Sequence, residues 1–281
     1  MSDTSAKANL PTQEFAPATA TRFRFSERTL YASVVTAFAV ATGFTVYLCR
    51  SMSGGMSMPG HWTMSMMWMV MLGQTQFEAF LMFVAMWLAM MVAMMLPSAF
   101  PMLLLYHRAV AFRGQSRVGA LTFALAAGYF FAWVLFGVLA YVGGKAVTAA
   151  AMTWPAVSRL IPLTAGAALV LAGAYQLTPL KSACLKHCRD PLLLIAHHLH
   201  GGWRGAFRLG LHHGAFCAGC CWGLMLIQFV LGVMNLVVMV AVAAIIALEK
   251  VLARGELAAR ITGVAAILGG IWLVVVSLLG A

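Results

Sequence analysis

Long apolar stretches recur along the chain and constrain its fold more than any other feature. A stretch of about 20 predominantly apolar residues can cross a bilayer as a helix. The candidates are 30–48, 77–106, 120–142, 160–180, 212–231, 234–248 and 261–281. Only 9% of the residues are charged, far below the share in soluble domains, and no alternating pattern typical of membrane β-barrels occurs. The sequence therefore predicts an all-α protein, a polytopic transmembrane helical bundle with about seven spans. Pro97 and Pro101 are expected to kink or end the second stretch.

Basic residues set the expected orientation of the spans. They cluster before the first stretch, after the second and fourth, and before the last, whereas the other loops carry isolated basic residues. Because positively charged loops stay in the cytosol, this alternation predicts a cytosolic N-terminus. The net charge of +11 comes from these short clusters, so we expect the lipid bilayer as a partner and no nucleic acid.

The chain is expected to divide into a tail and one membrane domain. Residues 1–29 are polar and lack a cleavage signature, which predicts a disordered cytosolic tail. Residues 30–281 are predicted to form a single transmembrane metal-binding domain. Within it, the apolar run 212–248 is too long for one span, so we expect a tight hairpin near Gly232 and Asn235. If the short second half of this run is re-entrant, the number of spans is six.

Cysteine and histidine residues gather in two short motifs, "HGAFCAGCC" (213–221) and "CLKHC" (184–188). Within each motif, their spacing puts the side chains on one face of a helix. Thiols near the cytosol stay reduced, and a bound cation offsets the cost of a thiolate in an apolar span, so metal ligation is favoured over a disulfide. The alternative is that the cysteines are small buried hydrophobes. The inner metal site is expected to comprise His213, Cys217, Cys220, Cys221, Cys184, Cys188 and His187.

Methionines are concentrated in the first part of the chain. Fifteen of the 20 lie between Met52 and Met102, and the loop "SMSGGMSMPGHWTMSMMWMVM" (51–71) alone has eight. On the predicted orientation this loop faces outward, where thioethers, unlike thiols, form no disulfides and remain soft ligands for Cu(I). The loop therefore predicts a copper-collecting segment, with packing by adaptable side chains as the alternative. Its candidate ligands are Met56, Met58, His61, Met64 and Met66.

Other polar and sulfur-containing residues in or near the spans have simpler interpretations. A four-residue repeat of methionines forms one stripe on the second span, for which helix packing is favoured over a conduction path. This stripe consists of Met82, Met86, Met90 and Met94. For Glu78 and Glu249, a role as interfacial anchors is favoured over ligation of a harder metal or proton transfer. The "HHLH" segment (197–200) is an accessory metal site or, as we favour, a set of interfacial histidines.

Several motifs in combination resemble one known family. They are "MWLAMMVAMMLPSAFPM" (86–102), "YQLTPLKSACLKHCRDP" (175–191), "HGAFCAGCCWGLM" (213–225), "GVMNL" (232–236) and the terminal "EK" (249–250). Over roughly residues 30 to 280, the chain resembles an uncharacterised bacterial family of predicted metal-binding integral membrane proteins. The resemblance implies a multi-pass protein of the bacterial inner (plasma) membrane and a bound metal. Its motif residues are matched here by His213, Cys217, Cys220, Cys221, Cys184 and Cys188, while His187 and "HHLH" look like additions.

Copper handling is the favoured function, because soft ligands on both faces suit Cu(I) better than Mg²⁺ or Ca²⁺. Zinc and iron are the alternative metals. One alternative function is a membrane metalloenzyme, an oxygenase or redox subunit acting on an apolar substrate at the histidines of 197–213, although no nucleotide, flavin or haem motif occurs. Another is a structural zinc scaffold on Cys184, Cys188, Cys217 and Cys220. A metallochaperone or redox subunit is the expected protein partner, and both a monomer and an oligomer stay open.

Overall fold

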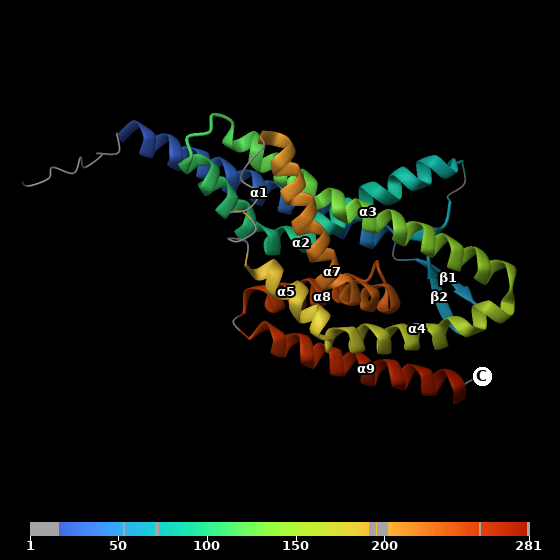
Figure 1. Ribbon diagram of the computed structural model, residues 1–281. Helices are drawn as coiled ribbons and strands as arrows, with labels where there is room; N and C mark the ends of the chain where they lie inside the picture. Colours follow the sequence, from blue (N-terminus) through green and yellow to red (C-terminus); the bar gives the residue numbers. More distant parts are fainter. Residues whose placement is uncertain are drawn as a thin grey trace, which may run out of the picture.

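The computed structural model describes residues 17–52, 54–70, 73–190, 195, 202–252 and 254–279. Their fold is helical, which confirms the all-α part of the predicted fold class (Figure 1). The helices are α1 (Pro17–Ser51), α2 (Gln76–Phe112), α3 (Val118–Thr153), α4 (Pro155–Gln176), α5 (Pro179–Arg189), α7 (Gly202–Leu231), α8 (Leu236–Val251) and α9 (Gly255–Leu279). Between α1 and α2 lie the strands β1 (Gly55–Met58) and β2 (Trp62–Ser65) and the short 3₁₀ helix η1 (Met66–Trp68).

Six helices of the described chain are long and apolar enough to cross a membrane, namely α1, α2, α3, α4, α7 and α9. The predicted stretch 234–248 forms helix α8, which has only 16 residues and is not among these six. The hairpin expected before it is confirmed. Gly232 turns the chain with a φ of +113°, and Asn235 Oδ1 accepts hydrogen bonds from the backbone N–H groups of Val237 and Val238 at 3.0 and 3.2 Å.

Several helix boundaries differ from those expected. Helix α1 begins at Pro17, inside the segment expected to be a tail, and α7 begins at Gly202, ahead of the predicted span. The expectation that α2 could end at Pro97 or Pro101 is wrong, because the helix continues through both prolines to Phe112. In a bundle of this kind, neighbouring helices and local side chains can compensate for the backbone hydrogen bonds that proline removes.

The loop between α1 and α2 contains a small β-hairpin that the all-α prediction missed. Strands β1 and β2 pair antiparallel, with Met56 opposite Met64 and Met58 opposite Trp62. Paired residues point to the same face of a hairpin, so these four side chains share one face. The Trp62 Nε1–H donates to the Ser158 carbonyl oxygen on α4 at 3.0 Å, which anchors the hairpin to the helical body.

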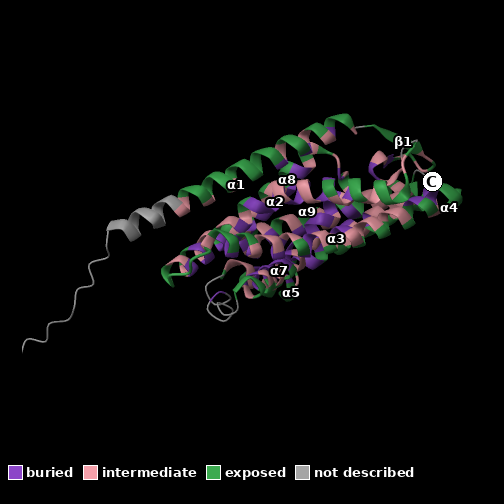
Figure 2. Ribbon diagram, turned by 90° about the horizontal axis from the view of Figure 1, so that it is seen from above, coloured by how far each residue is buried: buried purple, intermediate pink, exposed green. Residues whose placement is uncertain are grey.

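Buried residues gather on α2, α3 and α7, whereas α1 lies along one edge of the molecule and is mostly exposed (Figure 2). Glycines allow α3 and α7 to approach closely. A Cβ on Gly210 of α7 would run into the carbonyl oxygen of Leu125 on α3, and a Cβ on Gly214 would lie 2.6 Å from the carbonyl oxygen of Tyr129. Small residues permit the same close approach between membrane helices generally.

We expect Gly210→Ala to destabilise the protein, because the added methyl group forces α3 and α7 apart. Overpacking of this kind costs about 1–3 kcal/mol. Gly143→Ala is the matched control on α3, since nothing lies within 4 Å of the Cβ added there. Thermal unfolding of the detergent-solubilised variants measures the difference, and equal unfolding midpoints for the two variants would contradict the packing described.

Candidate metal centre

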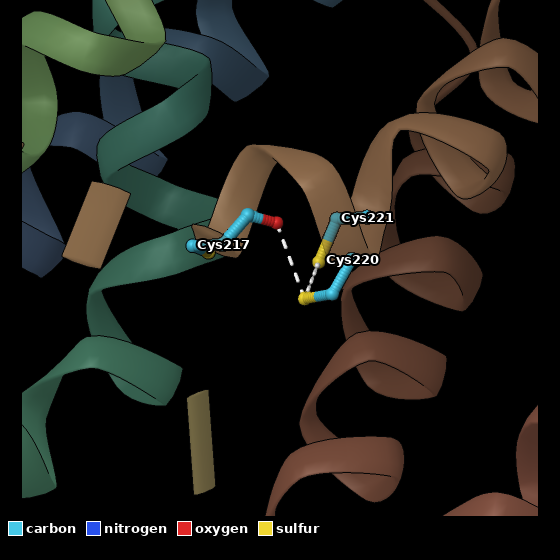
Figure 3. A group of neighbouring side chains, drawn as sticks. All are labelled: Cys217, Cys220 and Cys221. Carbon is cyan, nitrogen blue, oxygen red and sulfur yellow. Dashed lines mark hydrogen bonds between the residues drawn. The ribbon is translucent and has the colours of Figure 1, made fainter. Parts of the chain in front are cut away.

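Three cysteine sulfurs of α7 lie together in the interior of the bundle. The Sγ atoms of Cys217, Cys220 and Cys221 are all within 4.8 Å of one another, and all three side chains are buried (Figure 3). Cys220 Sγ lies 3.3 Å from Cys221 Sγ and also donates to the carbonyl oxygen of Cys217 at 3.2 Å (Figure 3). All three thiols are free. The helical spacing seen in the sequence therefore does bring these three side chains together.

Helix α5 brings the "CLKHC" motif alongside α7. Cys188 Sγ lies 3.8 Å from Cys220 Sγ, and Cys184 Sγ lies 3.6 Å from the position that a Cβ on Gly219 would take. Both of these cysteines are half-buried. Thr178 caps the start of α5, where its side chain accepts from the Lys181 N–H. The second motif thus adds a fourth sulfur next to the group on α7.

The two candidate histidine ligands lie beside the cysteines rather than within their group. His213 is 4% exposed, and its Nδ1 has no hydrogen-bond partner in the described part of the chain. The ring of His187 stacks on Phe216 at a centroid distance of 4.0 Å, and its Nε2 is likewise without a partner among the described residues. A buried ring nitrogen without a hydrogen-bond partner is costly, and a bound cation would offset that cost.

A lysine and a tyrosine contact the buried sulfur of Cys217. Lys250 Nζ on α8 donates to Cys217 Sγ at 2.8 Å and to Ser98 Oγ at 3.3 Å. Tyr129 Oη on α3 lies 3.0 Å from the same sulfur. The ammonium group stabilises a negative charge on Cys217 by direct Coulomb attraction. Neither residue was among the predicted site residues, although Lys250 stands at the end of an apolar stretch in the "EK" motif.

A second buried lysine fixes the backbone of the cysteine group. Lys181 Nζ donates to the carbonyl oxygen of Cys220 at 2.5 Å and forms an ion pair with Glu249 at 2.7 Å. Both charged side chains are 1% exposed, and Gln176 Nε2 donates to the second oxygen of Glu249 at 3.2 Å. The interpretation of Glu249 as an interfacial anchor is therefore wrong. Its carboxylate is instead held inside the bundle by α4 and α5.

The outer methionine candidates lie on the hairpin, in different environments. Met56 is exposed, Met58 and Met66 are half-buried, and Met64 is buried. His61 is exposed at the turn and adopts a positive φ of 58°. The structure therefore groups Met56, Met58 and Met64 on one hairpin face, with His61 at its end. Part of this face packs on the helical body.

Two further sequence features are the methionine stripe of α2 and the "HHLH" histidines. The methionine stripe of α2 is not uniform, because Met82 is 60% exposed whereas Met86, Met90 and Met94 are buried. The "HHLH" histidines at 197, 198 and 200 lie outside the described residues. The stripe therefore includes three core side chains and one surface side chain.

The donor set of the three buried cysteines suits a soft cation. No carboxylate belongs to this group in the described chain, and hard cations such as Mg²⁺ and Ca²⁺ require oxygen ligands. Thiolates select Cu(I), Zn²⁺ or iron–sulfur clusters. The residues present therefore fit a thiophilic metal ion.

Comparison with known proteins agrees with this chemistry. The sequence model of the PpoB2 family, described as a copper chaperone, matches residues 84–273, which is more than half of the 281-residue chain. The chain therefore belongs to this copper chaperone family. The match covers both cysteine motifs and the buried methionines of α2, whereas the hairpin precedes it. No curated protein and no solved structure matches the chain.

We expect Lys181→Met to destabilise the protein strongly, because it leaves the Glu249 carboxylate buried without its partner. Breaking one side of a buried ion pair costs about 3–5 kcal/mol, whereas replacing both sides with apolar residues is often neutral. The double variant Lys181→Met/Glu249→Leu should therefore regain most of the loss. Thermal unfolding in detergent measures both variants.

Glu27→Gln is the control for this experiment. Glu27 pairs with the half-exposed Arg108 at 2.7 Å, and a pair of this kind contributes about 0–1 kcal/mol. A double variant no more stable than Lys181→Met alone would contradict the role assigned to the buried pair.

Proposed function

We propose that this protein is an integral membrane copper chaperone that holds Cu(I) on Cys217, Cys220 and Cys221 and passes it to an acceptor protein. The observation that carries this proposal is the group of three buried sulfurs within 4.8 Å of one another, in a chain of the copper chaperone family. Copper is the cargo in this function. The protein protects it during transfer and catalyses no reaction on it.

The surroundings of the sulfurs favour Cu(I) among thiophilic ions. Thiolates in an apolar interior require positive charge nearby, and Lys250 already provides one ammonium group at Cys217. Bound Cu(I) would add one further positive charge without demanding oxygen ligands. Burial also shields the sulfurs from water and from oxidants, which attack accessible thiolates first.

Helix α5 supplies a route by which copper can leave. Cys188 lies 3.8 Å from Cys220 and is half-buried, so it links the buried group to the surface of the bundle. An acceptor that offers a thiolate or an imidazole can take the ion by ligand exchange at Cys188, with no free ion released. The acceptor is thus a second protein with soft ligands, either a metallochaperone or a redox enzyme subunit.

The membrane setting rests on the six apolar helices and the distribution of basic residues. We propose that residues 30–281 form one transmembrane domain in the bacterial plasma membrane. Because Arg-rich segments alternate along the chain, the N-terminus and α5 would face the cytosol and the methionine hairpin would face outward. Copper would then be collected outside and delivered on the cytosolic side.

A structural zinc site is the second candidate, because Cys188 completes a set of four neighbouring sulfurs with Cys217, Cys220 and Cys221. Four thiolates arranged as a tetrahedron are a common structural zinc site. Elemental analysis separates the candidates. A zinc scaffold would retain zinc permanently and unfold when it is removed, whereas a chaperone would exchange copper while staying folded.

Replacing Cys217, Cys220 and Cys221 together by Ser should abolish most Cu(I) binding and leave membrane insertion intact. The reason is that a hydroxyl is a harder and poorer ligand for Cu(I) than a thiolate. Anaerobic competition with a chromophoric Cu(I) chelator measures the affinity in detergent. Cys49→Ser, on α1, is the matched control and should bind Cu(I) as the wild type does. Unchanged affinity of the triple variant would contradict the ligand assignment.

Replacing Met56, Met58 and Met66 by Leu should impair copper-dependent growth when copper is scarce, because the outer segment loses its soft ligands. The purified variant should still fill the inner site when Cu(I) is supplied directly. Met152→Leu, which changes an exposed methionine at the end of α3, serves as the control. Unaltered growth of the hairpin variant at limiting copper would show that these methionines only pack.

A further inference from the structure

A buried amide on α7 is left half-satisfied beside a methionine. Gln228 is 2% exposed, its Nε2 donates to Met90 Sδ at 3.8 Å, and its Oε1 has no hydrogen-bond partner among the described residues. A buried carbonyl oxygen without a partner costs about 1–3 kcal/mol. The Met90 thioether is a soft donor for Cu(I), and the Gln228 oxygen on the neighbouring amide is a neutral donor held away from water.

The contacts between α2 and α7 fix the depth of this pair. Trp87 stacks on Phe229 at a centroid distance of 5.8 Å, and Gln228 contacts Met90. Further along α2, Ser98 is joined to Cys217 through Lys250. The two helices therefore run antiparallel, and Met90 lies between an aromatic layer and the level of Cys217. The distance along α2 from Met90 to Ser98 is roughly 12 Å at 1.5 Å per residue.

Thioethers occupy the whole of this interval on α2. Met90, Met91, Met94 and Met95 are all buried, and they belong to one continuous cluster with the three cysteines. Methionine is the residue of choice for irregular packing, but packing alone gives no reason for a half-satisfied amide in the same place. The interval from Met90 to the level of the cysteine group therefore contains four buried thioethers, which are soft ligands.

An aromatic layer separates this interval from the methionine hairpin. Trp68 of η1 lies near Phe83 and Phe229 at centroid distances of 5.6 and 6.3 Å, and Phe83 stacks on Trp87 at 5.9 Å. Aromatic faces attract cations while excluding water. Met67, on the same short helix, is buried in the same cluster. Soft or π-rich groups thus continue from the hairpin side to Met90.

We propose that Met90 and Gln228 form an intermediate Cu(I)-binding station on a thioether-lined path from the hairpin to the cysteine group. This inference rests on the proposed copper function and adds the route by which copper reaches the inner site. The weak N–H···S contact is exchanged for a copper–sulfur bond when the ion arrives. Thioethers are neutral ligands, so they hold Cu(I) less tightly than thiolates, and the ion moves on toward Cys217, Cys220 and Cys221.

The test measures filling of the cysteine site from each side of the membrane. The full chain is produced in bacteria, and Cu(I) is added either to spheroplasts or to inside-out vesicles. A Cu(I) chelator stops uptake, the protein is purified, and its copper content is measured against time. In the preparation that exposes the hairpin, Met90→Leu and Gln228→Leu should fill about tenfold more slowly than the wild type, with the same final copper content.

Matched variants separate a ligand role from packing. Met102→Leu changes another buried methionine of α2, which belongs to a different cluster, and should fill at the wild-type rate. Exchanging Met for Leu conserves volume, so these variants should fold. Gln228→Met supplies a second thioether beside Met90 and should fill faster than Gln228→Leu. In the opposite preparation, all variants should fill alike.

Each outcome decides a different claim. Filling of Met90→Leu at the wild-type rate from the hairpin side would overturn the station while leaving the cysteine site standing. Equal slowing in Met102→Leu would also overturn it, because the effect would then be one of packing. If wild-type protein retains no copper from either side, the proposed copper function itself fails.

Discussion

The charge of the cysteine sulfurs has to be balanced inside an apolar bundle, and the rest of the structure depends on how this is done. Thiolates far from water are unstable unless a cation lies nearby. Lys250 meets this need at Cys217, and Lys181 binds the backbone at Cys220. Lys250 belongs to α8 and Lys181 to α5, so these contacts hold both helices against α7, which carries the three cysteines. The Lys250 ammonium favours the thiolate form of Cys217, and a thiolate is the form of cysteine that binds a metal ion.

The close contact of α3 with α7 serves the same site. Gly210 and Gly214 have no side chain, so the backbones of α3 and α7 can approach closely. This approach places Tyr129 Oη of α3 at 3.0 Å from Cys217 Sγ. A bulkier residue at either glycine would move the tyrosine away from the sulfur. Packing and site chemistry are therefore coupled, and the sulfur group is held by side chains from several helices. A site of this kind can bind an ion in a defined position and still release it toward the half-buried Cys188.

Sequence alone predicted the local features and missed those that depend on distant partners. Apolar length predicted most of the long helices, and helical spacing predicted that Cys217, Cys220 and Cys221 meet, because both follow from residues close in the chain. Helical spacing also predicted a helical turn at "CLKHC", but not the full extent of α5 from Pro179 to Arg189, since this helix is short and polar. The repeat from Met82 to Met94 was treated as one stripe, but a four-residue repeat drifts by about 40° per step around a helix, which leaves Met82 on the surface. The ion pair of Lys181 could not be foreseen, because Glu249 is far away in sequence.

X-ray absorption at the copper edge of the wild-type protein, loaded anaerobically with copper below saturation, tests the central claim most directly. Binding at the three buried cysteines predicts the edge of Cu(I) and a first shell made of sulfur alone, since no carboxylate belongs to that group in the described chain. An oxidised ion, or a shell dominated by nitrogen and oxygen, would contradict this account, because such a spectrum requires ligands other than the buried sulfurs.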